Sequence, residues 1–276
     1  MTVSTENNHG LTSPNTRSSA APTEPQQFTK DGGITLSRKD LADSSSSKMH
    51  GTLTLVDEIG TLTLEEQQTI PAWWLQLVTA DPLSAVQIAI EHWRKALPTQ
   101  LPRFLQVLES EGIDVVLVKA TSDLYDGLGL LYAIETAGRG QKFIIGYPPT
   151  AQLTPPATNF SPEFQTFYTS LHDGIGYHLQ VPMGIIRSGE LIDWKSWSTQ
   201  DSADVRFQTP TPVRLPNTET LFIVYDENTS ACILVDTDPE DTDIWATDSG
   251  EFVSYAGKRN SVWELIDDWM RLRHTP

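Results

Sequence analysis

The densest group of residues that could do chemistry is the acidic run Asp236-Thr-Asp-Pro-Glu-Asp-Thr-Asp243. Carboxylates at alternate positions can gather on a hard cation such as calcium. The EF-hand pattern is not met, because Pro239 takes its fourth position, Asp241 stands where the turn glycine belongs, and Thr247 replaces the bidentate glutamate. We therefore expect a solvated or partner-facing acidic loop, with no metal and no cofactor.

A second polar group follows a predicted helix, where Tyr168, His172, Asp173 and His178 are close in sequence. A histidine near a helix end is more often a cap than a catalytic base. The chain has no Gly-x-Ser-x-Gly elbow, no His-Glu-x-x-His, no phosphate loop and no Gly-x-Gly-x-x-Gly fingerprint. We expect no catalytic residue and no enzymatic activity.

The chain has one cysteine, Cys232, so it can form neither an intrachain disulfide nor a zinc cluster of cysteines. This residue lies in the apolar run Ala231-Cys-Ile-Leu-Val235. A small side chain buried in the core is therefore favoured over a nucleophile.

The charge of the chain restricts its partners. Its 276 residues carry a formal net charge of -17, and the pI is about 4.6. Such a surface repels phosphate backbones and anionic membranes and attracts a basic protein. The first 25 residues have neither a basic start nor an apolar run, and no apolar run is long enough to cross a bilayer, so we expect a cytoplasmic protein.

The first half of the chain predicts a tail and an α+β unit. Residues 1–50 are rich in Ser, Thr and Pro and are predicted to be a mobile tail. Residues 51–154 are predicted to form an N-terminal α+β unit, with helices that begin near Pro71, Pro82 and Leu101. Its expected strands are 51–56, 61–64, 113–118, 128–135 and 141–146, the last two as a hairpin. This order favours an antiparallel sheet flanked by helices.

The second unit is predicted to be 155–276. Prolines near residues 148–156 indicate either a domain boundary or a loop within one continuous sheet. A helix with Ser161 as N-cap opens the unit, and a helix with Ser261 and Glu264 as a capping box closes it. In the closing helix Asp267 and Asp268 are expected on the polar face and Trp263 at its edge. The expected strands between the two helices are 176–180, 184–187, 193–197, 220–225, 231–236 and 244–245.

Two of these stretches carry a family resemblance. The first is Ser161-Pro-Glu-Phe-Gln-Thr-Phe-Tyr168 followed by the turn Asp173-Gly174, and the second is Ser261-Val-Trp-Glu-Leu-Ile-Asp-Asp-Trp269. Together they resemble the SUKH superfamily, which includes the yeast cell-wall synthesis regulator and many bacterial immunity proteins. The likeness covers roughly residues 155–272 and implies a SUKH-like α+β fold in the C-terminal half. The chain departs from the family in having Asp-Gly for the usual Asn-Gly and a Pro-rich insertion at 209–216.

The resemblance and the charge together predict a binding protein. We expect a non-enzymatic immunity-type protein that neutralises a basic toxin, for example a nuclease or another toxin that acts on nucleic acid, with a regulatory or scaffold module as the alternative. Acidic residues would steer the partner, and aromatic residues among them would anchor it. The candidate partner-binding residues are Asp226, Glu227, Asp236, Asp238, Glu240, Asp241, Asp243, Trp245, Asp248 and Tyr255.

Overall fold

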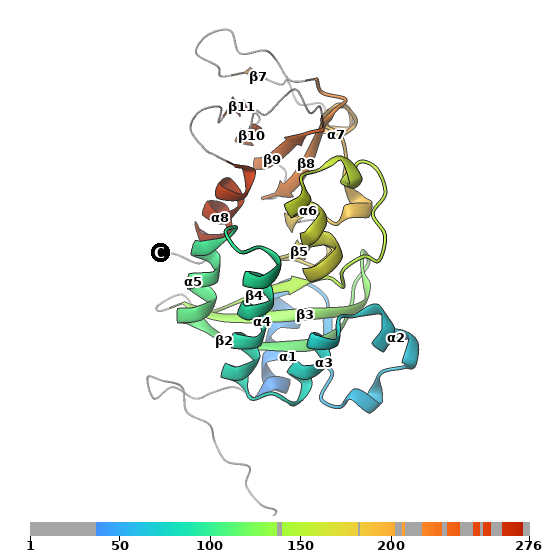
Figure 1. The fold of residues 1–276 in the computed structure, drawn as a ribbon, viewed down its shortest axis with the longest axis vertical. Helices are drawn as coiled ribbons and strands as arrows, with labels where there is room; N and C mark the ends of the chain where they lie inside the picture. The colour runs from blue at the N-terminus through green and yellow to red at the C-terminus, as the bar shows by residue number, and fades with distance from the viewer. Residues whose placement is uncertain are drawn as a thin grey trace, which may run out of the picture. The chain divides into compact units, whose positions relative to one another are not determined.

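The computed structural model describes residues 37–136, 140–181, 183–201, 206–207, 217–227, 231–237, 245–248, 251–254 and 261–272. These residues form an α+β fold around one sheet (Figure 1). The α-helices are α1 (Arg38–Met49), α2 (Leu64–Thr69), α3 (Ala72–Thr79), α4 (Pro82–Ala96), α5 (Pro102–Glu111), α6 (Pro162–Thr166), α7 (Trp194–Asp201) and α8 (Val262–Leu272). The strands are β1 (Thr52–Leu55), β2 (Gly112–Thr121), β3 (Asp126–Thr136), β4 (Gly140–Gly146), β5 (Ile175–Gly176), β6 (Gly184–Ile185), β7 (Arg206–Phe207), β8 (Leu221–Asp226), β9 (Ala231–Asp236), β10 (Trp245–Asp248) and β11 (Glu251–Ser254).

The strands lie in the order β1-β2-β3-β4-β5-β6-β8-β9-β10-β11-β7. Neighbours are antiparallel except β11 and β7, which are parallel. The predicted antiparallel sheet is therefore confirmed, as are the hairpins β3–β4 and β8–β9. Because Ile145 of β4 pairs with Gly176 of β5, the two predicted units share one sheet, and the prolines near residues 148–156 lie in a loop between its strands.

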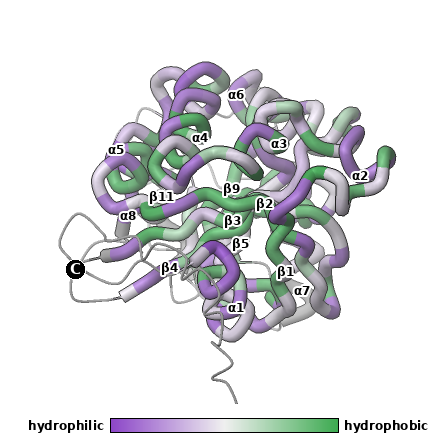
Figure 2. The backbone as a smooth tube through the Cα atoms, turned by 90° about the horizontal axis from the view of Figure 1, so that it is seen from below, coloured by the Kyte–Doolittle hydropathy of each residue, from purple (hydrophilic) through white to green (hydrophobic). Residues whose placement is uncertain are grey.

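Helices cover both faces of this sheet (Figure 2). The main core lies between one face and the helices α3, α4, α5, α6 and α8. Strand β2 serves both faces, since side chains alternate along a strand: Val115 and Leu117 belong to the main core, while Val116 and Val118 are buried toward α1. On the same side as α1, helix α7 covers a smaller core, here called the α7 cluster. It consists of Ile186, Trp194, Leu221, Ile223, Cys232, Leu234 and Trp245.

Helix α1 corrects the prediction of a tail through residue 50. Ser37 caps it, since its hydroxyl accepts from the amide of Asp40 while the Asp40 carboxylate accepts from the amide of Ser37. Leu41 and Met49 are buried, and the main chain of Met49 accepts a hydrogen bond from the amide of Leu179. Leu41, Ala42 and Met49 thus supply the buried apolar contacts of a helix that is mostly polar.

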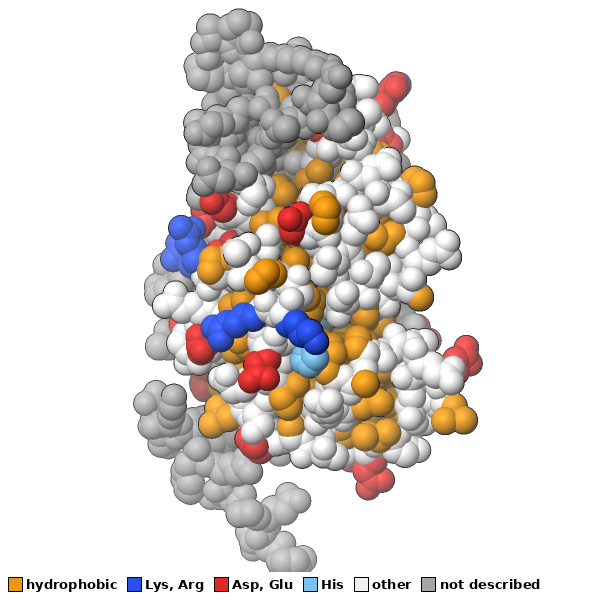
Figure 3. Space-filling view, viewed as in Figure 1, with side chains coloured by type: hydrophobic (Ala, Val, Ile, Leu, Met, Phe, Trp, Pro, Cys, Tyr) orange, Lys and Arg blue, Asp and Glu red, His pale blue; other side chains and the backbone are white. Residues whose placement is uncertain are grey.

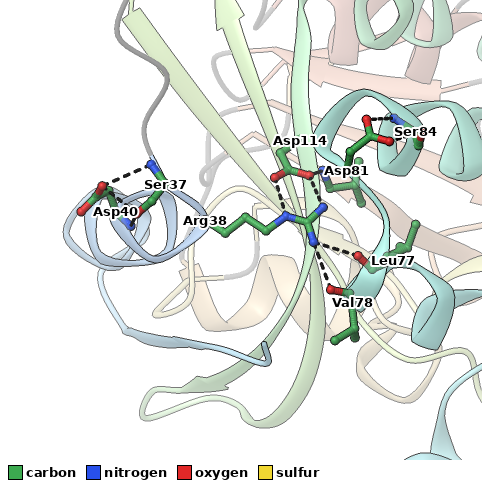
Figure 4. Close-up of polar contacts among 9 residues, drawn as sticks. Ser37, Arg38, Asp40, Leu77, Val78, Asp81, Ser84 and Asp114 are labelled. Carbon is green, nitrogen blue, oxygen red and sulfur yellow. Dashed lines mark hydrogen bonds and ion pairs between the residues drawn. The ribbon is translucent and has the colours of Figure 1, made fainter. Parts of the chain in front are cut away.

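Arg38 makes the polar attachment of α1 (Figure 4). Its Nε and Nη2 donate to the two carboxylate oxygens of Asp114 on β2, at 2.8 and 2.9 Å. Its Nη1 donates to the carbonyls of Leu77 and Val78 in the last turn of α3, at 2.9 and 3.3 Å. One planar guanidinium therefore joins α1, α3 and β2, and the negative end of the α3 dipole favours its charge.

Two predicted strands do not form, because a helix begins within or just after each of them. Residues 61–64 run into α2, because Thr63 and Glu66 form a capping box that starts a helix there. Residues 193–197 run into α7, where the carboxylate of Asp193 accepts from the amide of Ser196 at 2.8 Å. In both places the capping residues, rather than the alternation of apolar and polar residues, decide the backbone conformation.

The helices that carry the family resemblance differ in part from their predictions. Ser161 precedes α6 without a side-chain cap bond, and the chain continues from α6 into a π-helix at Phe167–Leu171. At α8 the Ser261 hydroxyl does accept from the amide of Glu264, at 3.3 Å. Trp263, expected at the edge, is buried, and so are Asp267 and Asp268 of the expected polar face. No helix in the described part of the chain is both long and apolar enough to cross a membrane.

Candidate functional site

The strand register gathers some of the candidate partner-binding residues at one end of the sheet. Asp226 pairs with Cys232, Ala231 pairs with Asp248, and Asp248 pairs with Glu251 across the next hairpin. Glu227 follows β8 directly. Glu227, Asp248 and Glu251 therefore lie at the same end of the strands β8, β10 and β11, and we call these positions the acidic end of the sheet.

The other acidic candidates do not belong to this end. Asp236 is the last residue of β9, five residues beyond Ala231, which corresponds to about 17 Å along an extended strand. Asp238, Glu240, Asp241 and Asp243 follow it in the sequence and lie outside the described residues, as does Tyr255. The candidates therefore do not form a single patch over the described part of the sheet.

Two candidates are buried, which corrects their assignment to a partner-facing surface. Trp245 has 0% of its surface exposed and packs in the α7 cluster. Asp226 has 7% exposed, and its carboxylate lies 3.8 Å from the thiol of Cys232. Cys232 is itself fully buried, as predicted, and burial raises the pKa of its thiol. Because an indole buries a large apolar area, packing in the core stabilises Trp245 even though its neighbours in the sequence are acidic.

The polar group around His172 does not form a shared site. The Tyr168 hydroxyl donates to the carbonyl of Ile186 at 3.0 Å, and Asp173 accepts from the amide of Ser188 at 2.9 Å. His178 stacks on His50 instead, with ring centroids 4.3 Å apart. Among the described residues, no group of three or more His, Cys, Asp or Glu side chains is placed to hold a metal ion.

His172 is enclosed in the main core rather than placed as a helix cap. Its Nε2 lies 2.7 Å from the hydroxyl of Tyr132, which also accepts from Nε1 of Trp93 at 3.0 Å. Burial lowers the pKa of His172 to about 3, so the ring is neutral at pH 7. The aromatic rings around it are those of Trp73, Trp74, Trp93, Tyr132 and Phe167.

A pocket lies on the sheet face that carries α1 and α7. Its volume is about 320 Å³, within the usual range for small-molecule sites. Leu179 connects it to the end of α1, and Ile186 and Ile223 connect it to the α7 cluster. Its lining residues are Leu124, Tyr125, Tyr147, His178, Leu179, Val181, Ile186, Arg187, Glu190, Ile192, Trp197, Ile223 and Asp226.

Glycines next to the pocket let two of its side chains take their places. A Cβ on Gly176 would lie 2.7 Å from the Tyr147 hydroxyl, and a Cβ on Gly174 would lie 2.8 Å from Cγ of Arg187. Gly174 also has φ +97°, a conformation that side chains with a Cβ rarely adopt. The loop entering β5 therefore requires glycine for the tyrosine and the arginine to fit.

Arg187 is held rigidly in the pocket wall. Its Cζ lies 5.2 Å from the ring centroid of Tyr125 and 5.3 Å from that of Tyr147, and its Nη1 donates to Glu190 at 2.9 Å. Cation–π contacts and an ion pair thus fix the plane of the guanidinium. Burial raises the pKa of Tyr147 to about 12, against the opposing effect of Arg187, so this phenol stays neutral.

Sequence reasoning missed this pocket. Tyr125, Tyr147 and Arg187 come from three separate loops, and none of them stands in a recognisable motif. A signal does lie at the rim, where Leu124 and Val181 are 56% and 37% exposed. Large apolar side chains left in solvent around a pocket are typical of binding sites.

Comparison with known proteins gives no further assignment. No family model matches this chain, and searches of curated proteins and of solved structures find no match.

Proposed function

We propose that this chain is a non-enzymatic immunity-type protein that binds and neutralises a basic protein toxin, one that acts on nucleic acid. The motifs around Ser161 and Ser261 that resemble the SUKH superfamily support the proposal, as does the antiparallel α+β fold that contains both. A toxin that must meet phosphates tends to be basic, so an acidic protein is well suited to cover it.

The acidic end of the sheet is the observation that carries the proposal. Glu227, Asp248 and Glu251 occupy neighbouring positions in a chain whose net charge is -17. Acidic residues at one end of a sheet add to its negative potential, which steers a basic partner and raises its association rate. The β8–β9 and β10–β11 pairings hold these positions on adjacent strands rather than on independent segments.

The face covered by α4 and α5 differs in its charge pattern. Acidic and basic side chains lie next to each other there (Figure 3). Arg94, for example, pairs with Glu109 at 3.0 Å. Charges of both signs cancel at a distance, so we expect this face to steer a basic partner less than the acidic end does.

Capture of the partner tests the proposal. Tagged full-length protein would be used as bait in lysate of its own source cells at moderate salt, and a stoichiometric partner identified by mass spectrometry. We expect one basic protein that stops growth when expressed alone and is harmless when expressed with this chain. A partner without toxicity, or a set of cellular regulators, would contradict the proposal and favour a regulatory module.

Charge variants then locate the contact. Neutralising the acidic end by Glu227→Gln, Asp248→Asn and Glu251→Gln should slow association about three- to tenfold at low salt and weaken its salt dependence. The control Asp57→Asn, Glu65→Gln and Glu91→Gln removes the same charge from exposed positions elsewhere. Equal slowing by the two triple variants would show that net charge alone, and not the acidic end, guides the partner.

A further inference from the structure

We propose that the pocket binds a small monocarboxylate with an apolar body, aromatic or branched, whose carboxylate lies against Arg187, Tyr147 and His178. The proposal does not depend on toxin binding, because it rests on the pocket wall alone.

One side of the pocket suits an apolar body. Ile186, Ile192, Ile223 and Trp197 line it from the α7 cluster and its surroundings, and Leu124 and Val181 form the exposed rim. A volume of about 320 Å³ corresponds to roughly ten water molecules. A ligand with roughly a dozen non-hydrogen atoms would displace them and cover the rim.

The polar groups that remain open in the wall are donors. Glu190 is the one hydrogen-bond acceptor that the described residues supply to the Arg187 guanidinium, which has five N–H donors. The Tyr147 hydroxyl has no hydrogen-bond partner among the described residues and is neutral, so it can donate as well. Both groups border the same pocket.

His178 adds a third donor through its tautomer. Its Nδ1 accepts from the amide of Gln180 at 3.0 Å, which places the proton of the neutral ring on Nε2. Burial and the nearby His50 both lower the pKa of His178, so the neutral ring prevails at pH 7. An N–H donor therefore joins the guanidinium and the phenol in the pocket wall.

Each of the two carboxylates that line the pocket already makes one contact through one of its oxygens. Glu190 accepts from Arg187, and Asp226 lies within hydrogen-bond distance of the Cys232 thiol. An ammonium ligand would have to displace these contacts and approach the guanidinium, whereas a carboxylate meets unused donors. Charge-assisted bonds from a fixed guanidinium are among the strongest that a neutral or anionic head could gain here.

Three probes of one shape test the charge of the ligand. Phenylacetate, phenylacetamide and phenethylamine share an aromatic ring and differ in their heads, and each would be titrated into the full-length protein by calorimetry and by NMR. We expect phenylacetate to bind most tightly, phenylacetamide more weakly and phenethylamine weakest. Stronger binding of the amine, or no binding of any probe, would overturn the proposal.

Two substitutions with opposite expected effects on phenylacetate affinity locate the site. Arg187→Met removes the guanidinium but keeps the stem between the tyrosines, and it should weaken phenylacetate binding about tenfold or more. Glu190→Gln removes the competing carboxylate from a half-exposed position, and it should strengthen binding about two- to fivefold. Weaker binding by Glu190→Gln would contradict the proposal even if Arg187→Met failed to fold.

A second ion pair of the chain provides matched controls. Arg94 and Glu109 form an exposed Arg–Glu pair at 3.0 Å on the opposite face of the sheet. Arg94→Met and Glu109→Gln therefore make the same chemical changes away from the pocket, and neither should alter phenylacetate affinity. An equal effect of Arg94→Met and Arg187→Met would assign the binding to net charge rather than to the pocket.

Discussion

His172 makes the main core sensitive to acid. Its Nε2 lies 2.7 Å from the Tyr132 hydroxyl, whose oxygen accepts from Trp93, so three buried polar groups form one hydrogen-bonded chain, while Nδ1 of the ring is buried without a partner among the described residues. A protonated ring would lose its acceptor at Nε2 and place a charge among aromatic side chains. This residue therefore stabilises the fold only while it remains neutral.

The pH dependence of stability follows from this pKa. His172 has a folded pKa of about 3, below its value near 6.5 in the unfolded chain, so below pH 6.5 the unfolded chain binds more protons. Its contribution to the free energy of unfolding is thus complete above pH 6.5. Between pH 6.5 and pH 3 this contribution should fall by about 1.4 kcal/mol per pH unit, so about 2 kcal/mol should be lost by pH 5. Urea unfolding of the full-length protein at several pH values would measure this loss.

A variant separates His172 from the other titrating groups. The carboxyls of Asp114 and Asp267 have pKa values raised by burial, so they oppose the loss at low pH. The two aspartates contribute equally in wild type and in His172→Gln, so the comparison of the two proteins removes their effect. The free energy of unfolding of His172→Gln should fall less steeply on acidification than that of wild type. Tyr132→Phe retains the histidine and should retain the slope. An unchanged slope in His172→Gln would show that another group controls the acid response.

Asp267 replaces a missing helix cap. Helix α5 begins at Pro102 after Leu101, which offers no side-chain cap, and its first free amides belong to Arg103 and Phe104. Asp267 of α8 accepts from both, at 3.1 and 2.8 Å. Its carboxylate thus serves the N-terminus of a helix that is distant in sequence, where the dipole also favours negative charge.

Substitution of Asp267 should therefore cost more than substitution of its neighbour. Asp267→Ala leaves the buried amide of Phe104 and the partly buried amide of Arg103 without this acceptor and should lower the free energy of unfolding by about 2–3 kcal/mol. Asp268→Asn weakens an ion pair with the half-exposed Arg103 and should cost about 1 kcal/mol or less. Chemical unfolding of both variants would measure the difference, and equal losses would contradict a capping role for Asp267.

At the scale of the element, α1 is a part of the folded sheet domain. It buries Leu41 and Met49 against the sheet and brings Arg38 to Asp114, whose carboxylate is buried. Burial raises the pKa of Asp114, and the hydrogen bond and charge of Arg38 oppose that shift. The helix thus supplies the charge partner of a buried carboxylate on a central strand.

Truncations of α1 test this dependence. A chain starting at Ser37 keeps the cap, the apolar contacts and Arg38, so it should fold like the full-length protein. A chain starting at Gly51 loses all three, and it should unfold at lower urea and show weakened near-ultraviolet circular dichroism. Equal stability of the two truncated chains would show that α1 adds nothing to the fold.

A point substitution refines the same test. Arg38→Ala leaves the Asp114 carboxylate buried without its charge partner, which should cost about 2–4 kcal/mol. Lys39→Ala removes the same charge from the adjacent exposed position and should cost less than about 0.5 kcal/mol. Similar losses for both variants would contradict the role assigned to the Arg38 contacts.

The predictability of the elements depended on whether their signals were local. Asp81 before Pro82 marks the start of α4, and the alternating runs of β8 and β9 mark a hairpin, so both follow from neighbouring residues. Helix α1 was not predicted because its buried face contains only Leu41, Ala42, Ser45 and Met49, so the apolar signal in the sequence is weak. The burial of Asp267 was not predicted because its partners, Arg103 and Phe104, lie more than 160 residues away in the sequence.

At the scale of the whole molecule, the pocket depends on long-range placement. Its residues run from Leu124 to Asp226, and they meet because the short strands β5 and β6 connect the two halves of the sheet. Sequence could identify the charge of the chain and the acidic run 236–243. It could not show that Asp248 lies at the same end of the sheet as Glu227, since that follows from the pairing of β9 with β10.

The acidic end should also carry a cost in stability. A net charge of -17 opposes compaction through self-repulsion, and the repulsion is strongest where carboxylates are neighbours. Raising sodium chloride from about 10 to about 150 mM shortens the screening length from about 30 to about 8 Å, so the melting temperature should rise. The triple variant of Glu227, Asp248 and Glu251 should melt higher than wild type at low salt and respond less to added salt.

The control with Asp57→Asn, Glu65→Gln and Glu91→Gln has the same net charge and should gain less, because those positions are separated in the fold. Calorimetric melting of the three proteins at both salt concentrations distinguishes clustering from total charge. Equal gains would attribute the repulsion to the whole chain. A larger gain at the acidic end would show that the same carboxylates that steer a basic partner destabilise the free protein, as expected of charges retained for binding rather than for folding.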